Sequence, residues 1–193
     1  MKKYLALFFA VLLTLCCTAC AAQEPAAEEQ TPASVDGFCF TEENGYGFTS
    51  VPFGSSLQEV SDALNCTLVS KAESLGGTHD ETNDVYWTQE VDAVEVLGKK
   101  ARVEVAFDDG KLYDLSFALP AGPTDKVEPF YRETTEAFKN AFGEPMTEEE
   151  GENSASMLWR YDNSTQLLIS IQIQEDSALL QVGVADISVL SDQ

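Results

Sequence analysis

Apolar and polar residues alternate most regularly in residues 167–173, where every second position is Leu or Ile. After Glu175 and Asp176 the alternation resumes over residues 180–184. Alternation with a period of two is typical of a strand with one buried face. A two-residue turn at 175–176 would pair Ile171 with Leu180, which keeps both apolar sets on one face. The pattern predicts a β-hairpin with a polar and an apolar side.

A second alternating pair of segments lies earlier, at residues 101–107 and 113–117. Two aspartates and Gly110 separate them, which favours a three-residue turn with the glycine in the left-handed conformation. That turn would pair Val105 with Tyr113. We therefore predict a second hairpin whose apolar set includes Tyr113.

Two segments show a helical period instead. Ser56 and Glu59 have the spacing of a capping box at the start of a short amphipathic helix that continues to about residue 64. The second helix is predicted from about residue 124 to residue 142, where Gly143 stops it.

Each predicted helix is followed by an acidic loop, a tryptophan (Trp87 or Trp159) and period-two segments. This repeat predicts an α+β fold built from two helix-then-three-strand units, about 50–119 and 124–187. The units would form one antiparallel sheet with both helices packed on its apolar face. We expect both tryptophans to point into the core, so that Tyr86 would point to the opposite face.

The other face of the predicted sheet is polar and should meet water or a polar partner. We predict it as an interaction face, with these residues as its candidates: Tyr86, Glu104, Asp114, Gln172 and Gln181.

The start of the chain carries a targeting pattern. Lys2 and Lys3 precede an apolar run of about 12 residues, which is too short to span a bilayer, and small residues follow. Residues 15–20 resemble the lipobox of bacterial lipoproteins. The resemblance implies that residues 1–19 are a cleaved signal and that Cys20 bears the lipid. An ordinary cleaved signal without a lipid is the alternative.

Residues 20–36 contain Ala, Glu, Pro, Gln and Ser but few large apolar groups, so we predict a disordered acidic tether. Residues 37–193 have the size of one domain. Loss of the signal removes two of the 11 basic residues and none of the 33 acidic ones, which leaves a net charge of about −24. Such a charge disfavours binding to nucleic acid.

Cys39 and Cys66 are the two cysteines of the predicted domain. Outside the cytoplasm they could form a disulfide, because oxidising compartments preserve such bonds. Two buried free thiols or a catalytic thiol are the alternatives. A nucleophilic cysteine needs a base, and the single histidine, His79, lies in an acidic loop that would raise a thiol pKa.

That acidic loop holds the oxygen ligands that Ca²⁺ prefers. Its candidate cation or ligand residues are His79, Asp80, Glu81 and Asp84. The loop lacks the order of acidic residues found in an EF-hand, and acidic loops are commonly just solvated. We therefore predict no defined metal site and no cofactor, with Ca²⁺ as the alternative.

Several short motifs resemble small exported α+β modules with a tandem helix-then-sheet layout. The motifs are residues 53–60, 96–101, 107–112 and 142–145, together with Trp159. The layout is similar to the β-lactamase-inhibitor-protein fold and to the small outer-membrane assembly lipoproteins, and the chain also resembles exported lipoproteins of gut-type Gram-positive bacteria. The first two families imply protein binding.

Enzyme chemistry has little support, since the chain has one histidine and no G-x-S-x-G, H-E-x-x-H or phosphate-binding motif. The sequence predicts a lipid-anchored protein on the extracytoplasmic face of a cell membrane. We expect a non-catalytic module that binds or scaffolds an envelope or extracellular protein. A protein that binds cations or small ligands, and a hydrolase of cell-wall or peptide substrates, are the alternatives.

Overall fold

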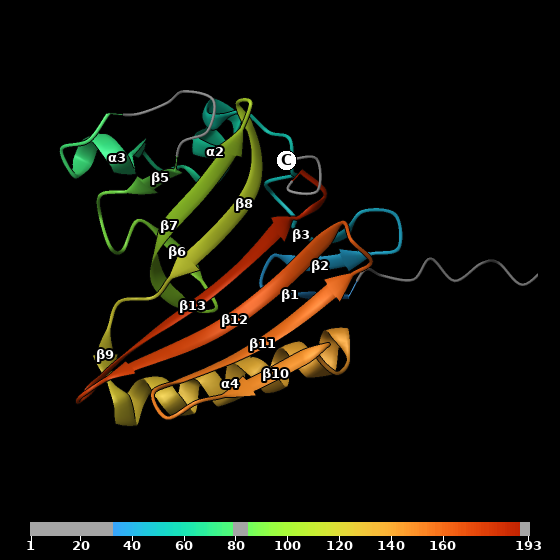
Figure 1. Ribbon diagram of the computed structural model, residues 1–193, viewed down its shortest axis with the longest axis vertical. Helices are drawn as coiled ribbons and strands as arrows, with labels where there is room; N and C mark the ends of the chain where they lie inside the picture. Colours follow the sequence, from blue (N-terminus) through green and yellow to red (C-terminus); the bar gives the residue numbers. More distant parts are fainter. Residues whose placement is uncertain (1–32, 79–84, 190–193) are drawn as a thin grey trace, which may run out of the picture. The chain divides into compact units, whose positions relative to one another are not determined.

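The computed structural model describes residues 33–78 and 85–189. These belong to one compact unit, residues 32–193. Its class is α+β with antiparallel strand pairing, as the alternation predicted. The described elements fall into a small sheet, a large sheet and three helices (Figure 1).

The small sheet has the order β1-β2-β3. Its strands are β1 (Ala33–Val35), β2 (Phe38–Thr41) and β3 (Gly45–Phe48). The predicted tether extended to residue 36, and this boundary was wrong because β1 pairs with β2 from Ala33 onward. Apolar contact holds the short strands in place, since Val35 packs against the core and Phe38 is fully buried.

The large sheet has the order β10-β11-β12-β13-β8-β7-β5-β4, with β6 added beside β7 and β9 beside β13. In the first half of the chain its strands are β4 (Leu68–Ser70), β5 (Val85–Thr88), β6 (Val94–Val96), β7 (Lys99–Asp108) and β8 (Lys111–Ala118). In the second half they are β9 (Gly122–Pro123), β10 (Thr147–Glu150), β11 (Ser154–Tyr161), β12 (Thr165–Gln174) and β13 (Ser177–Asp186).

The two halves of the chain do not form separate tandem units. Strand β13 pairs with β8 in continuous register, with Val184 opposite Leu115 and Val182 opposite Phe117. This pairing satisfies the edges that each half would otherwise leave open. Both halves therefore lie in one antiparallel sheet, as predicted, but the first half contributes β4–β8 and the second β9–β13, so the predicted tandem units of three strands each are wrong.

Helices α2 (Leu57–Leu64) and α4 (Thr124–Phe142) lie where the helical period predicted them. Ser56 caps α2, and its capping box with Glu59 is present. A third helix, α3 (Lys71–Ser74), was not predicted.

The helices do not simply cover one face as a pair. Helix α4 contacts β12 and β13, and β3 of the small sheet contacts the same two strands. Figure 1 shows α4 and the small sheet behind the large sheet. Helix α2 also packs on the core, through the fully buried Val60. The apolar side of the sheet thus carries the small sheet in addition to helices, and the prediction lacked that second sheet.

The β12–β13 hairpin has the predicted register, with Ile171 opposite Leu180 across a two-residue turn. The β7–β8 hairpin does not. Its turn has two residues, and a β-bulge near Ala106 and Phe107 shifts the register so that Val105 faces Leu115. Leu112 is therefore buried in place of Tyr113.

Trp159 and Phe38 are the largest fully buried side chains of the core, a single cluster with residues from both sheets, α2 and α4. Trp159 is 1% exposed, as predicted, and its indole Nε1–H donates to the Gly143 carbonyl at 2.8 Å. Strands β12 and β13 contact α4 and β3, and Phe117 of β8 contacts Phe38 and Phe48 of the small sheet. This packing leaves the opposite side of the large sheet for contact with solvent or a partner.

Candidate binding face

The side of the large sheet away from α4 carries mostly polar side chains, and we call it the open face. Side chains alternate across a strand, so the residues between the buried ones must point this way. Its central members are Glu104, Asp114, Ser116, Gln166, Leu168, Ser170, Gln181 and Gly183. Of the predicted interaction residues, Glu104, Asp114, Gln172 and Gln181 thus lie on the open-face side of their strands.

One row of paired residues crosses the open face from β5 to β12. Trp87 lies opposite Glu104, Glu104 opposite Ser116, Ser116 opposite Gly183, and Gly183 opposite Leu168. The row passes from an aromatic ring through a carboxylate and a hydroxyl to an aliphatic side chain. Different kinds of recognition group are therefore held in fixed order by backbone pairing.

A shallow hollow of about 150 Å³ lies in this row. Gly183 lines the hollow, and only glycine fits there without strain, because a Cβ at this position would lie 2.8 Å from the Cβ of Ser116. Leu168 lines the hollow and is 40% exposed, which is unusual for a large aliphatic residue on this sheet. The hollow thus combines an apolar contact with surrounding polar groups.

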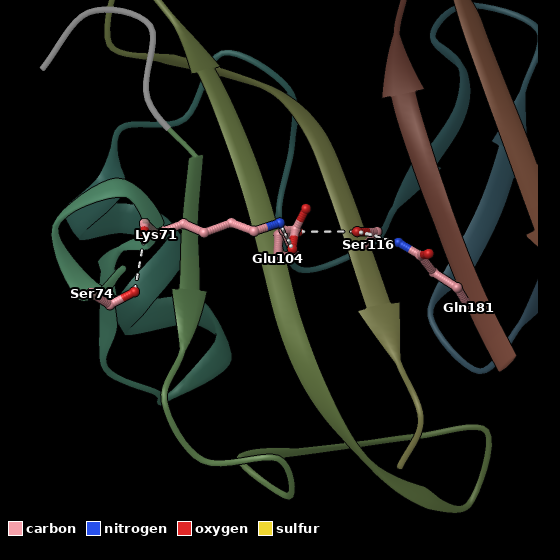
Figure 2. Close-up of polar contacts among 5 residues, drawn as sticks. All are labelled: Lys71, Ser74, Glu104, Ser116 and Gln181. Carbon is pink, nitrogen blue, oxygen red and sulfur yellow. Dashed lines mark hydrogen bonds and ion pairs between the residues drawn. The ribbon is translucent and has the colours of Figure 1, made fainter. Parts of the chain in front are cut away.

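Hydrogen bonds fix the polar side of the hollow (Figure 2). The Gln181 amide Nε2 donates to Ser116 Oγ at 3.3 Å, and Ser116 Oγ donates to the Glu104 carbonyl at 3.4 Å. Lys71, the first residue of α3, reaches Glu104 and forms an ion pair with it at 2.7 Å. The short helix that the sequence did not predict therefore orders one carboxylate of the open face.

The second carboxylate, Asp114, has a perturbed titration. Burial, which disfavours the charged form, and the negative charge of Glu104 raise the pKa of Asp114 from 3.8 to about 6. Within the described residues no hydrogen bond to the Asp114 carboxylate offsets that burial. The open face therefore holds a carboxylate that would gain from a donor or cation on a partner.

This environment predicts that Asp114→Asn stabilises the protein at neutral pH. A folded pKa above the unfolded one means that stability falls as pH rises from about 4 to 6, and the loss persists above that window. We expect the free energy of unfolding to rise by about 1–3 kcal/mol at pH 7.5, and by almost nothing at pH 4.

Urea denaturation at both pH values measures this difference. The exposed Asp92→Asn is the control for the loss of one surface charge. An Asp114→Asn variant less stable than the parent protein at pH 7.5 would contradict the cost assigned to the buried charge.

The two neighbouring aromatics of β5 point opposite to the prediction. Tyr86 packs against the core with its ring 5.6 Å from that of Phe107, so it does not belong to the open face. Trp87 points to the open face instead, where Lys71 Nζ lies 5.3 Å and Arg102 Cζ 4.7 Å from its ring. Two cation–π contacts explain this orientation, because they hold the indole where cations from α3 and β7 converge.

The predicted disulfide between Cys39 and Cys66 is wrong for this structure, in which both thiols are free. Phe38 points into the core, so the pleat of β2 turns Cys39 to the other face, whereas Cys66 packs against the core after α2. Burial raises the pKa of the Cys66 thiol. That shift opposes formation of a thiolate nucleophile.

Two predicted sites cannot be placed on the fold. Cys20 and the acidic loop residues His79, Asp80, Glu81 and Asp84 lie outside the described residues. Within the described part of the chain, no group of three or more metal-ligating side chains comes together. None of the described helices is long and apolar enough to cross a membrane.

Several open-face residues were missed from the sequence. Arg102 and Leu168 could have been assigned to this face, because they alternate with buried residues of β7 and β12. Gly183 alternates with Val182 and Val184 in the same way, but its close approach to β8 carries no local signal, and neither does the position of Lys71. Their roles depend on a helix and a strand pairing that bring distant segments together.

Comparison of the chain with protein-family models, curated proteins and solved structures found no match in any of the three.

Proposed function

We propose that the protein is a membrane-tethered, extracytoplasmic binding module that holds another protein on the open face of its large sheet. The tether part rests on the targeting pattern and the lipobox resemblance of residues 1–20. The binding part rests on the geometry of the open face.

The observation that carries the proposal is the setting of Leu168. This side chain is 40% exposed beside the hollow at Gly183, among hydrogen-bonding groups. Protein interfaces typically have an apolar centre with a polar rim, and a few central anchors supply most of the affinity. Leu168 would be such an anchor, with Ser170 and Gln181 near its rim.

Charge adds a preference for the partner. The mature chain would carry about −24 net charges, and Asp114 and Glu104 place two carboxylates beside the hollow. Such a field increases the rate of encounter with a basic surface more than it increases affinity. The partner is therefore expected to present an aliphatic or aromatic side chain with Lys or Arg nearby.

Leu168→Arg tests the proposal, because it places a charged side chain at the proposed anchor. We expect the full-length variant, isolated from the membranes of its host, to lose the protein that copurifies in stoichiometric amount with the parent chain. Quantitative mass spectrometry of the copurified proteins measures this loss, which should be about tenfold or more in recovery.

Val91→Arg is the matched control, because Val91 is 49% exposed and is not among the residues lining the hollow. It makes the same change of charge on an apolar surface position, so it should retain the partner. Equal loss with both variants would reject the open face as the binding surface, as would retention with Leu168→Arg.

A further inference from the structure

A second hollow lies away from the residues of the open face, where the start of β7, the end of β8 and the first turns of α4 meet. Its lining consists of Lys99, Lys100, Leu119, Pro120, Lys126, Val127 and Phe130, and its volume is about 280 Å³. We call it the basic hollow. It has an apolar floor, because Leu119 is 7% exposed and Val127 and Phe130 pack against the core.

The charge of this hollow is unusual for the chain. Without Lys2 and Lys3, the chain has nine basic residues against 33 acidic ones, and three of the nine line the basic hollow. No acidic residue lines it. A local excess of ammonium groups in such an acidic protein favours an anion at this place over other surface positions.

The three ammonium groups are available to a ligand. Lys99 Nζ lies 5.1 Å from the centroid of the Phe130 ring, and within the described residues it has no carboxylate at ion-pair distance. Lys100 and Lys126 approach Glu95 and Asp125 only at 3.9 Å, and all four of these side chains are more than half exposed. Exposed pairs of this length contribute little, so a better anionic partner can replace them.

The first turn of α4 adds to the preference of the basic hollow for an anion. Its N-cap residue, Pro123, makes no side-chain capping bond, and Lys126 and Val127 of the early helix line the hollow. The N–H of Thr124 already donates to the Asp176 carbonyl and Asp125 lies in the first turn, so the remaining amides of that turn add only a modest partial positive charge. Side-chain ammonium groups and the helix end thus favour an acidic head, while Leu119, Pro120 and Phe130 favour an apolar tail.

We propose that the basic hollow binds a small anionic amphiphile, in which one phosphate or carboxylate head is joined to a short apolar chain or ring. The volume lies just below the usual range of sites for drug-sized ligands, so the ligand is small. Its head would contact the lysines, and its tail would lie against Phe130 and Leu119. This site is separate from the open face and does not depend on the function proposed for it.

Isothermal titration calorimetry of the full chain, held in nanodiscs of zwitterionic lipid, tests the site with octyl phosphate below its micelle concentration. Octyl glucoside supplies the same chain without charge, and inorganic phosphate supplies the head alone. We expect saturable binding of octyl phosphate at one site per chain, and at least about tenfold weaker binding of each partial ligand.

The lysines are tested by the triple variant Lys99→Gln, Lys100→Gln and Lys126→Gln. The matched control is the triple variant Lys111→Gln, Arg132→Gln and Arg160→Gln, which removes the same charge from positions outside the hollow. The first variant should bind octyl phosphate about tenfold or more weakly, and the control should keep the parent affinity. Thermal melting of both variants shows that they are folded, as expected for exposed side chains.

Three results would overturn the proposal. Equal binding of octyl glucoside would show simple adsorption of an apolar chain, and equal weakening by both triple variants would show a general charge effect. Binding only to nanodiscs that contain anionic phospholipid, with no binding of free octyl phosphate, would identify a membrane-surface contact instead of a ligand site.

Discussion

Phe38→Ala should lower the free energy of unfolding by about 3–5 kcal/mol, which is the range for truncation of a fully buried aromatic residue. Phe38 is 0% exposed. Its ring lies 5.1 Å from that of Phe48, 5.8 Å from that of Phe117 and 5.4 Å from that of Phe138. These partners come from β3, β8 and α4, so one truncation weakens the contact between the small sheet, the large sheet and the helix.

Urea denaturation followed by tryptophan fluorescence measures this loss as a lower midpoint at unchanged slope. Phe40→Ala is the internal control, because Phe40 lies on the same strand but is only partly buried. Phe40→Ala should lower the free energy of unfolding clearly less than Phe38→Ala does. A loss below about 1 kcal/mol for Phe38→Ala would contradict the central place of the small sheet in the core.

Gly183→Ala should destabilise the protein by about 1–3 kcal/mol through overpacking between β8 and β13. An added Cβ would lie 2.8 Å from the Cβ of Ser116 and 3.0 Å from the Leu115 carbonyl oxygen. Both atoms belong to the neighbouring strand, so they cannot move aside as the end of a flexible side chain would. The strands must separate locally.

Gly47→Ala is the matched control for Gly183→Ala, because Gly47 also lies in a strand and a Cβ there would meet no atom within 4 Å. It should change stability by less than about 1 kcal/mol. Ser116→Gly in the Gly183→Ala background should restore part of the loss, since it removes the closer of the two contacts. Equal thermal shifts for the two glycine variants would refute the close approach of β8 and β13.

Much of the fold could be predicted from local pattern. The β12–β13 hairpin has strict alternation and a two-residue turn, and these two features together leave one register that keeps both apolar sets inside. The β7–β8 hairpin has apolar residues at both 112 and 113, so alternation alone cannot show which one is buried. The β-bulge, which places Leu112 and not Tyr113 on the buried side, forms only when β8 pairs with β7.

The candidate face was also predictable only in part, because contacts from other elements decide which way some of its side chains point. Asp114 and Gln181 follow from alternation, but the orientation of Trp87 depends on Lys71 and Arg102, which come from other elements. Three consecutive large residues at 85–87 give no local preference for one face. The small sheet was largely missed because its short strands gain stability only by packing on the core.

Site-specific photo-crosslinking tests the binding proposal most directly. A benzophenone amino acid would replace Leu168 in one full-length variant and Val91 in another, and both would be irradiated in the membranes of the host. The proposal predicts one dominant crosslinked protein from position 168, with the same partner much reduced or absent from position 91. Equal crosslinking of that protein from both positions, or none from position 168, would contradict it.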